Sequence, residues 1–546
     1  MSPTPPPVVE RRRWAVLAVV CLSVFVVVVD GTIVNVALPS LVLELGASTR
    51  DLQWIVDAYL LVFTGLLLAA GGLGDRYGRK RMLLGGLVVF GATSALAGSA
   101  ATSGELIAGR ALMGIGAALI FPATLAIITN VFTDARERAG AIAIWSAVTG
   151  MAVAAGPITG GWLLEQFWWG SIFFVNVPIV IVAVAAVLVL VPESRDEHAP
   201  RLDLVGAALS IAAIGTLVFT IIEAPIWGWT DPLTLVGFAS AAALMVAFIR
   251  WELRVAHPML PVRIFRNLRF SAASVAITSA FFALFGFIFL ITQYFQLVRG
   301  YGPLEAGVRT IPVAGSIALA SILSPRIVAR VGTTRVVATG LGLMAVSFAW
   351  ISTASVATEY LEIVGQMLLL GTGLGLTTAP ATESIMGSLD ADKAGVGSAV
   401  NDTTRELGGT LGVAVVGSVF SSVYVGALAD GTVVPGLPDA VRTVTEDSVG
   451  AAQLVAAELG AGAPAFLAEV NDAFLAGLAV ACLVAAGVAA LGALVVLRFL
   501  PARALVVATA DPVPGSPADV APTVAPDRIT ADRVTPDPEP DAAGVS

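Results

Sequence analysis

Long apolar runs separated by short polar segments fill most of this chain. Fourteen of the runs are about 20 residues long, which is the length that an α-helix needs to cross a bilayer. The pattern therefore predicts an all-α integral membrane protein with 14 transmembrane helices. The expected spans are residues 14–38, 54–73, 82–101, 104–129, 139–162, 171–191, 202–222, 233–250, 270–297, 306–325, 335–354, 360–380, 395–425 and 473–498.

The basic residues between these runs predict how the helices are oriented. With the N-terminus in the cytoplasm, the inner segments before the C-terminal tail hold 20 Lys and Arg residues. The outer segments hold four, which are Arg50, Arg299, Arg309 and Arg442. Because positively charged segments stay on the cytoplasmic side, we expect a multi-pass protein of the cytoplasmic membrane with both termini inside.

Three segments lack the apolar character of the spans. Residues 1–13 are polar and are expected to form a cytoplasmic N-terminus, since the run that follows is too long for a signal peptide. Residues 426–472 are acidic and are expected to form an external loop, with a helix over residues 451–470. Residues 499–546 are rich in Pro, Ala, Asp and Val, so we expect a disordered cytoplasmic tail.

Composition supports a membrane protein and excludes several classes of function. The chain is 57% hydrophobic and 13% charged, whereas soluble domains have about 45–50% and about 25%. The net charge of −9 arises largely in the polar segments, and no basic patch indicates nucleic acid. Cys21 and Cys482 lie in apolar runs at opposite ends of the chain, so we expect buried thiols and no disulfide.

No set of residues suggests an enzyme. The two histidines, His198 and His257, fall in polar segments without a partner nucleophile or metal-ligand set. No Walker-type glycine loop is present, so ATP is not the expected energy source. We therefore predict no catalytic residues, no metal and no cofactor.

A charged, glycine-rich segment follows the second span. It contains Gly74, Asp75, Arg76, Gly78 and Arg79. Tight turns need glycine where backbone approaches backbone, and mixed charges can form ion pairs that break and re-form as two bundles rock. Basic residues alone would indicate a simple membrane anchor, but an acid within a glycine frame favours conformational gating.

Part of this segment recurs after the tenth span, which suggests two related halves of the kind that transporters have. The second copy lacks the acid. The matching residues, at a constant offset of 254, are Arg76, Gly78 and Arg81 in the first copy and Arg330, Gly332 and Arg335 in the second.

Further motifs occur in a fixed order along the spans. They are Asp30–Pro39 in the first span, Trp54–Tyr59 in the second, Arg110–Gly116 in the fourth and Gly156–Gly161 in the fifth. Together with the charged segment, they resemble the major facilitator superfamily, and in particular its fourteen-span drug:proton antiporters of the multidrug and quaternary-ammonium efflux type. The resemblance covers about residues 14–498. Two positions depart from the family pattern, Ala152 and Gly170.

The resemblance implies a fold and a function. The fold would be two six-helix bundles, residues 14–191 and 270–498, joined by two linking helices within residues 202–250. The function would be proton-coupled efflux of drugs or other small amphipathic, including cationic, compounds by alternating access. The expected partners are a small-molecule substrate, protons and the lipid bilayer, and we expect a monomer.

Asp30 is the sharpest single residue, because it interrupts an apolar span where a charge costs about 2.5–3.5 kcal/mol. Burial disfavours the charged form of an acid, so Asp30 could exchange a proton near neutral pH. The resemblance makes it a coupling or substrate-site acid. The alternative is a helix-cap acid near the outer interface, since Gly31 follows it.

Two further motifs have both a functional and a structural interpretation. Arg110 lies well inside the fourth span and needs a partner or a water cavity; the resemblance implies proton coupling, and the alternative is a structural ion pair. Pro157 should kink the fifth span, where Gly156 and Gly160 form a small-residue face with Ala152. The resemblance implies a hinge and seal that favour export, and pure packing is the alternative.

Polar residues also interrupt the thirteenth span. Asp402, Arg405 and Glu406 share one helical face, which should line a central cavity and not lipid. Asp402 could meet a cationic substrate; the alternative is a salt-bridge cluster around Arg405. Asp57 in the second span is expected in the same cavity. Glu223, beside Pro225, is expected at a water-facing helix end.

Three other functions remain open from the residues alone. A dedicated exporter of one metabolite or antibiotic would have the same motifs. Uptake by proton symport is disfavoured by the Gly156–Pro157 motif. A membrane receptor or enzyme would leave the intramembrane charges unexplained.

Overall fold

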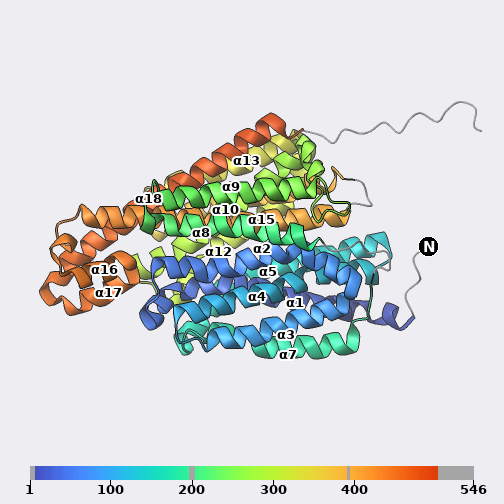
Figure 1. Ribbon diagram of the computed structural model, residues 1–546, viewed down its shortest axis with the longest axis horizontal. Coiled ribbons are helices and arrows are strands. Elements are labelled where there is room, and N and C mark those ends of the chain that lie inside the picture. Colours follow the sequence, from blue (N-terminus) through green and yellow to red (C-terminus); the bar gives the residue numbers. More distant parts are fainter. Residues whose placement is uncertain (1–6, 196–202, 390–393, 502–546) are drawn as a thin grey trace, which may run out of the picture. The chain divides into compact units, whose positions relative to one another are not determined.

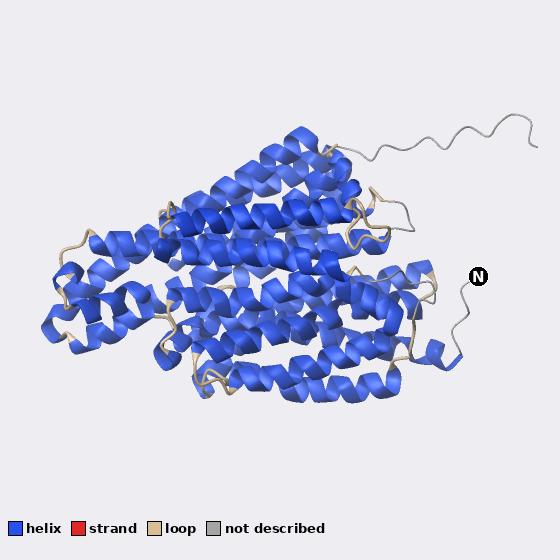
Figure 2. Ribbon diagram, viewed as in Figure 1, coloured by secondary structure: helices blue, strands red, loops and turns tan. Residues whose placement is uncertain are grey.

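The computed structural model describes residues 7–195, 203–389 and 394–501, and within these ranges the chain forms helices and loops but no strand (Figure 2). Fourteen helical segments are long and apolar enough to cross a membrane, and they coincide with the 14 predicted spans. The fold-class prediction is therefore confirmed. His198, residues 1–6 and all but the first few residues of the predicted tail lie outside the described ranges.

The helices of the N-terminal part pack mainly on one another, α1 on α5, α2 on α4 and α3 on both α4 and α7 (Figure 1). We call them the N-terminal helices. They are α1 (Pro7–Leu45), α2 (Thr49–Tyr77), α3 (Arg79–Gly98), α4 (Ser103–Val131), α5 (Ala135–Gln166), α6 (Ser171–Phe174) and α7 (Asn176–Leu190).

The helices of the C-terminal part repeat this arrangement, with α10 on α15, α12 on α14 and α13 on both α14 and α18. We call them the C-terminal helices. They are α10 (Leu268–Gln293), α11 (Pro303–Arg309), α12 (Ile311–Val331), α13 (Thr333–Ile351), α14 (Tyr360–Met386), α15 (Ala394–Ala429), α16 (Asp439–Asp447), α17 (Val449–Glu458) and α18 (Ala463–Phe499), with shorter turns η1 (Val262–Arg266), η2 (Tyr294–Val298), η4 (Val434–Gly436) and η5 (Gly460–Gly462).

The sequence repeat at offset 254 corresponds to equivalent backbone positions. Gly78 separates α2 from α3 with φ +111°, and Gly332 separates α12 from α13 with φ +88°. Only glycine adopts such φ values without strain. Gly86 and Gly340 are also 254 apart, and a Cβ on them would lie 2.9 and 2.6 Å from the carbonyl oxygens of Gly116 and Gly373. Both helix pairs therefore cross at backbone-to-backbone contact.

The N-terminal and C-terminal helices meet at one end of the molecule, the predicted outer end. Gln53 Nε2 on α2 donates to Ala414 O and Ser418 Oγ on α15, at 3.1 and 3.2 Å. Gln296 Nε2 donates to Val36 O at 2.9 Å. Among the described residues, every hydrogen bond between the two sets of helices lies at this end. The structure is therefore a state closed at the predicted outer end.

Helix α5 contributes the tightest contact of this closed end. A Cβ on Gly161 would lie 2.5 Å from Leu304 Cα, and one on Gly307 would lie 2.2 Å from Pro157 O. The backbones of α5 and α11 therefore touch directly, which only glycine permits at these positions. The contact extends the close packing expected for the fifth span to a helix on the other side of the molecule.

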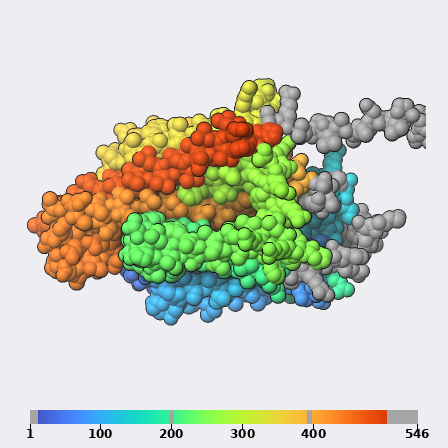
Figure 3. Space-filling view, turned by 45° about the horizontal axis from the view of Figure 1, so that its top comes forward, coloured from blue at the N-terminus to red at the C-terminus, as the bar shows by residue number. Residues whose placement is uncertain are grey.

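Two linking helices, α8 (Leu204–Trp227) and α9 (Pro232–Glu252), follow α7 and lie at the surface (Figure 3, green). Helix α8 packs against both α2 and α15 and so covers the line along which those helices meet. Glu223 is 7% exposed and pairs with Arg50 at 3.4 Å. The prediction that Glu223 faces water was therefore wrong, because the residue is buried near the end of α8 and its charge is paired with Arg50 of α2.

The acidic segment 426–472 is more ordered than a plain loop. The single helix predicted over residues 451–470 is two helices, since α17 ends at Glu458 and α18 begins at Ala463 after a turn at Gly460 with φ +53°. Helix α17 lies against both sides of the closed end. A Cβ on Gly450 would lie 2.8 Å from Val42 Cγ1, and Gln453 Nε2 donates to Leu297 O.

Glu469 organises the start of this segment. Its carboxylate accepts backbone N–H groups from Thr432, Val433 and Val434 at 2.8–2.9 Å. Three N–H donors aimed at one carboxylate replace the helix ladder that ends at Ala429, so the backbone remains satisfied where the chain turns.

We expect Glu469→Ala to loosen this turn. Loss of hydrogen bonds to a charged acceptor costs about 1.5–3 kcal/mol, so backbone amides 432–434 should exchange with deuterium at least tenfold faster. Glu458→Ala is the matched control, because Glu458 is exposed and accepts no hydrogen bond among the described residues. Equal exchange rates in the two variants would show that Glu469 does not hold the turn.

Candidate functional site

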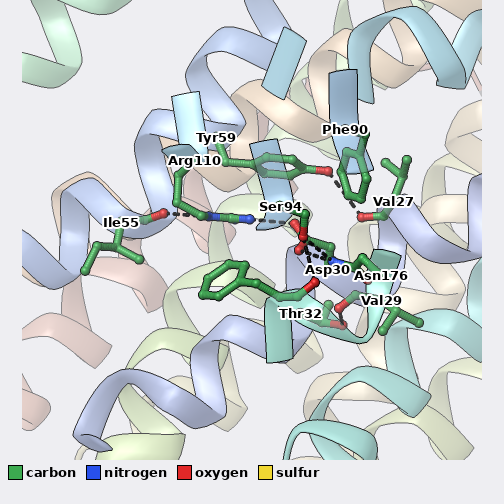
Figure 4. A network of polar contacts seen from close by, with 12 residues as sticks. Val27, Val29, Asp30, Thr32, Ile55, Tyr59, Phe90, Ser94, Arg110 and Asn176 are labelled. Atoms are coloured by element: carbon green, nitrogen blue, oxygen red, sulfur yellow. Dashed lines mark hydrogen bonds and ion pairs between the residues drawn. The ribbon is translucent and has the colours of Figure 1, made fainter. Parts of the chain in front are cut away.

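An ion pair buried among the N-terminal helices is the centre of the site. Asp30 on α1 and Arg110 on α4 are both 0% exposed, and Arg110 Nη1 lies 2.5 Å from Asp30 Oδ2 (Figure 4). Asp30 stands within α1, which continues to Leu45. The alternative of a helix-cap acid at the interface is therefore wrong, because Asp30 is an interior residue of its helix.

Helix α2 packs beside Arg110 and holds its guanidinium in place. Its Nε donates to Ile55 O at 3.0 Å, and its Cζ lies 4.2 Å from the centroid of the Tyr59 ring. Tyr59 is fixed in turn, since its hydroxyl donates to Val27 O at 3.2 Å. Nη2 has no hydrogen-bond partner among the described residues. A cation over a desolvated aromatic face gains about 2 kcal/mol, which partly offsets burial.

The other oxygen of Asp30 has a partner that sequence reasoning missed. Asn176 Nδ2 on α7 donates to Asp30 Oδ1 at 2.9 Å and to Ser94 Oγ on α3 at 3.1 Å. Helices α4 and α7 therefore both contact the carboxylate on α1, and α3 holds Asn176 through Ser94. A polar residue within the apolar sixth span was the available signal, but an uncharged amide carried too little weight beside the acids.

The Asp30–Arg110 pair has two consequences. Removing one partner of a buried ion pair costs about 3–5 kcal/mol, because the other charge remains unpaired. The same constraint makes the pair a candidate switch, since a proton on Asp30 removes its charge and leaves Arg110 without a counter-ion. Both interpretations of Arg110, structural pair and coupling group, are compatible with this geometry.

Asp57 is the least satisfied acid in the described part of the chain. It is 0% exposed, and neither carboxylate oxygen has a hydrogen-bond partner there. It lies one turn from Gln53 on α2, so it shares the face that meets α15. Thr64, seven residues further along this face, also has an unpartnered hydroxyl. Asp57 therefore lies at the line where α2 and α15 approach one another.

Asp402, Arg405 and Glu406 lie on α15 towards its predicted inner end, and all three are partly exposed. Arg405 forms no ion pair with a described carboxylate; its Nη2 donates to Thr382 Oγ1 at 3.3 Å, and its Cζ lies 5.4 Å from the Phe281 ring centroid. The alternative of a salt-bridge cluster around Arg405 is therefore not supported by the described contacts.

The charged segment after the second span is hydrogen-bonded to the residues that follow α7. Arg79 pairs with Asp75 at 2.8 Å, and Glu193 accepts the Lys80 backbone N–H at 3.2 Å. Gly74 is buried and its carbonyl accepts the Gly78 N–H at 3.0 Å. Arg76 is exposed, with its Cζ 5.6 Å from the Tyr77 ring centroid. The mixed charges thus fasten the α2–α3 turn, while Arg76 stays accessible.

The small residues of α5 pack against α1. A Cβ on Gly156 would lie 2.0 Å from Thr32 Oγ1, and one on Gly160 would lie 2.6 Å from Ile33 Cγ1. Thr32 and Ile33 directly follow the segment that carries Asp30, so the position of this carboxylate depends on α5. The helix continues through Pro157 as far as Gln166.

Comparisons with known proteins agree on one kind of molecule. Residues 20–413 match the model of the Major Facilitator Superfamily. The multidrug efflux pump LfrA of Mycolicibacterium smegmatis is 36% identical over 479 residues, which is 87% of this chain and 94% of that protein. The tetracenomycin C resistance and export protein of Streptomyces glaucescens is 34% identical over 501 residues, or 90% and 93% of the two chains.

A solved structure gives the same fold. A bacterial homologue of the human lysosomal transporter Spinster, in an inward-facing and unoccupied conformation, superposes with a TM-score of 0.64 at 17% identity. The match covers 90% of this chain and 98% of that one.

We expect Gly78→Ala to destabilise the α2–α3 junction. The φ of +111° strains any residue with a Cβ, and the added methyl would lie 2.5 Å from Glu193 Oε1. Such strain costs about 1–3 kcal/mol, so the melting temperature of the purified protein in detergent should fall. Gly85→Ala on α3 is the control, because nothing lies within 4 Å of its Cβ position. Equal melting temperatures would contradict the strain.

We expect Gly161→Ala to weaken the closed outer end, because its methyl would overlap the α11 backbone. A cysteine at Ser418, which is buried at this end, should then react at least threefold faster with a membrane-impermeant maleimide added to intact cells. Gly150→Ala, on the same helix with nothing within 4 Å, is the control. Labelling that is no faster than in this control would show that the contact does not hold the end closed.

Proposed function

Because the chain belongs to the major facilitator superfamily, we propose that it is a proton-coupled exporter of drugs and other small amphipathic, including cationic, compounds. Its family and its relatives are transporters, and LfrA is a multidrug efflux pump. The observation that carries the coupling part of the proposal is the fully buried Asp30–Arg110 pair. Among the described residues, the only charge partner of Asp30 is an arginine fixed by α2, and such an acid is suited to bind and release one proton.

The proposed organisation is two six-helix bundles, residues 14–191 and 270–498, that rock about a central site. The linking helices within 202–250 remain against the line where α2 and α15 meet. Both termini face the cytoplasm, and the carrier works as a monomer. The contacts at the closed end, together with the partly exposed Asp402 and Glu406 near the other end, support entry of substrate from the cytoplasmic side.

In the proposed cycle, the acidic and basic residues act one after another. A cationic substrate enters from the cytoplasm or inner leaflet and is attracted by Asp402 and Glu406, with Arg405 opposing a second cation. Opening of the outer end then exposes Asp30 to external protons. Protonation of Asp30 leaves Arg110 as an unpaired positive charge, which disfavours the bound cation. Substrate therefore leaves outwards and the proton leaves inwards.

The remaining residues would gate the movement. Asp75 and Arg79, with Gly74 and Gly78 in the turn and Arg76 exposed beside it, would break and re-form contacts at the inner end. Gly156, Pro157 and Gly160 would let α5 slide on α1 and α11. Asp57 would be a further acid of the cavity, since its carboxylate has no hydrogen-bond partner among the described residues.

A dedicated exporter of one antibiotic is the second candidate. The relative from Streptomyces glaucescens is a tetracenomycin C resistance and export protein, and it covers more of this chain than LfrA does. The two candidates differ in substrate breadth and share the same proton coupling.

The decisive measurement is efflux of ethidium from drug-sensitive cells, with and without a protonophore. We expect rapid efflux that the protonophore abolishes. Asp30→Asn should slow it at least tenfold, because the amide cannot exchange a proton, and Asp402→Asn should slow efflux of cations more than of neutral compounds. Asp439→Asn, an equivalent change at a largely exposed acid of α16, should leave efflux unchanged.

Each other outcome has a definite meaning. Full efflux by Asp30→Asn would remove Asp30 from coupling. Efflux that persists in the presence of the protonophore would remove the proton as the driving ion. Absence of ethidium efflux despite normal membrane expression would favour the narrow-substrate exporter.

A further inference from the structure

A chain of hydrogen bonds connects the backbone of α6 to Asp30. Ser94 Oγ donates to Phe173 O at 2.8 Å. Asn176 Nδ2 donates to Ser94 Oγ at 3.1 Å and to Asp30 Oδ1 at 2.9 Å (Figure 4). Ser94 is 0% and Asn176 is 1% exposed. Neither residue belongs to the motifs that the sequence analysis singled out.

The direction of this chain follows from the number of hydrogens available. A serine hydroxyl has one hydrogen, and that of Ser94 is used on Phe173 O. Ser94 Oγ therefore accepts from Asn176, so the NH₂ of the amide, and not its oxygen, must face both Ser94 and Asp30. Among the described residues, Asn176 Oδ1 is consequently left without a partner, although it is buried. An unsatisfied buried oxygen is unfavourable, so the surroundings impose this orientation on the amide.

The imposed orientation distinguishes the two protonation states of Asp30. An ionised carboxylate only accepts hydrogen bonds, whereas a protonated one also donates. Held as a donor, Asn176 serves the ionised form. To accept from a protonated Asp30, the amide must turn over, which brings Oδ1 towards the carboxyl and requires the Ser94 hydroxyl to leave Phe173 O.

We propose that Asn176 and Ser94 are positioning residues that set the proton affinity of Asp30, with Ser94 locking the Asn176 amide in the orientation that favours the ionised carboxylate. The proposal rests on the proposed function, in which Asp30 is the coupling acid. It assigns to α3, α6 and α7 a part in coupling, since loading of the proton requires the Ser94 contact with α6 to break.

The other groups around Asp30 are few. Arg110 faces it from α4, and Tyr59 stands beside Arg110 on α2 with its hydroxyl committed to Val27 O. In the described part of the chain, α5, α6, α10, α11 and α17, which also pack on α1, bring no ion pair or side-chain hydrogen bond to Asp30. Arg110 and Asn176 are therefore its only direct polar partners there.

The test measures protonation directly, with the full-length protein in proteoliposomes and infrared difference spectra recorded across a pH titration. The carboxyl band that disappears in Asp30→Asn reports on Asp30. We expect Asn176→Ala to move its midpoint towards alkaline pH by about one unit, a tenfold gain in proton affinity, because the ionised form loses a donor. Ser94→Ala should move it in the same direction by about half a unit, because the freed amide can turn over.

Thr93→Ala is the matched control. Thr93 is the neighbour of Ser94 and is also buried, but its hydroxyl donates only to carbonyls of its own helix, Val89 O at 2.7 Å and Phe90 O at 3.3 Å. Its midpoint should equal that of the wild type. The pH profile of ethidium efflux, recorded on the same samples, should shift with the infrared midpoint.

The outcomes separate this proposal from the one it rests on. An Asp30 band that titrates at the wild-type midpoint in both Asn176→Ala and Ser94→Ala overturns the positioning role and leaves the coupling role intact. If Asn176→Ala does not fold, an unshifted Ser94→Ala alone overturns it. Efflux that is independent of pH in the wild type, or unaffected by Asp30→Asn, overturns the proposed function instead.

Discussion

Asp30 and Arg110 carry opposite charges and are both buried, and the need to stabilise these two charges away from solvent explains much of the local structure. Asp30 and Arg110 would each be expensive alone, and their surroundings supply what water would supply. Ile55 gives a carbonyl, Tyr59 an aromatic face and Asn176 an amide. These groups come from α2 and α7, so α1, α2, α4 and α7 are all fixed around one pair. Addition of one proton to Asp30 would remove the negative charge of the pair and leave Arg110 without a counter-ion.

A second constraint is that helices in a bilayer associate through close contact, without a hydrophobic effect between them. Glycines at Gly86 and Gly340 allow the same backbone crossing in each set of helices, at positions 254 apart. Gly161 and Gly307 allow another between the two sets. The first kind keeps each set of helices rigid. The second joins the two sets of helices, so it is the contact that the proposed transport cycle would have to break.

The spans, their number and the main motifs could be read from the sequence because hydropathy and motif order are local properties. Asp30 and Arg110 were recognisable as charges in apolar runs, yet their pairing was left open, since it depends on how α1 and α4 cross. Asn176 was missed because its role depends on its contacts with Asp30 and Ser94, which lie on other helices and are far from it in the sequence. The error at Glu223 has the same origin: a helix end beside proline was predicted, whereas Arg50 on another helix makes burial of the acid acceptable. The break at Gly460 was also missed, because Ala and Leu favour helix on both sides of it.

The short helix α17 contacts both sets of helices at the closed end, so it would take part in any movement of one set relative to the other. It touches α1 at Val42 and the end of η2 at Leu297, one on each side of the closed end. In the proposed transport cycle these two sides separate, and α17 must then lose its contacts with at least one of them. A binding protein that recognised α17 together with both sides of the closed end would prevent the two sides from separating. At the predicted outer end, such a binder would block the proposed transport cycle without crossing the membrane or competing with substrate.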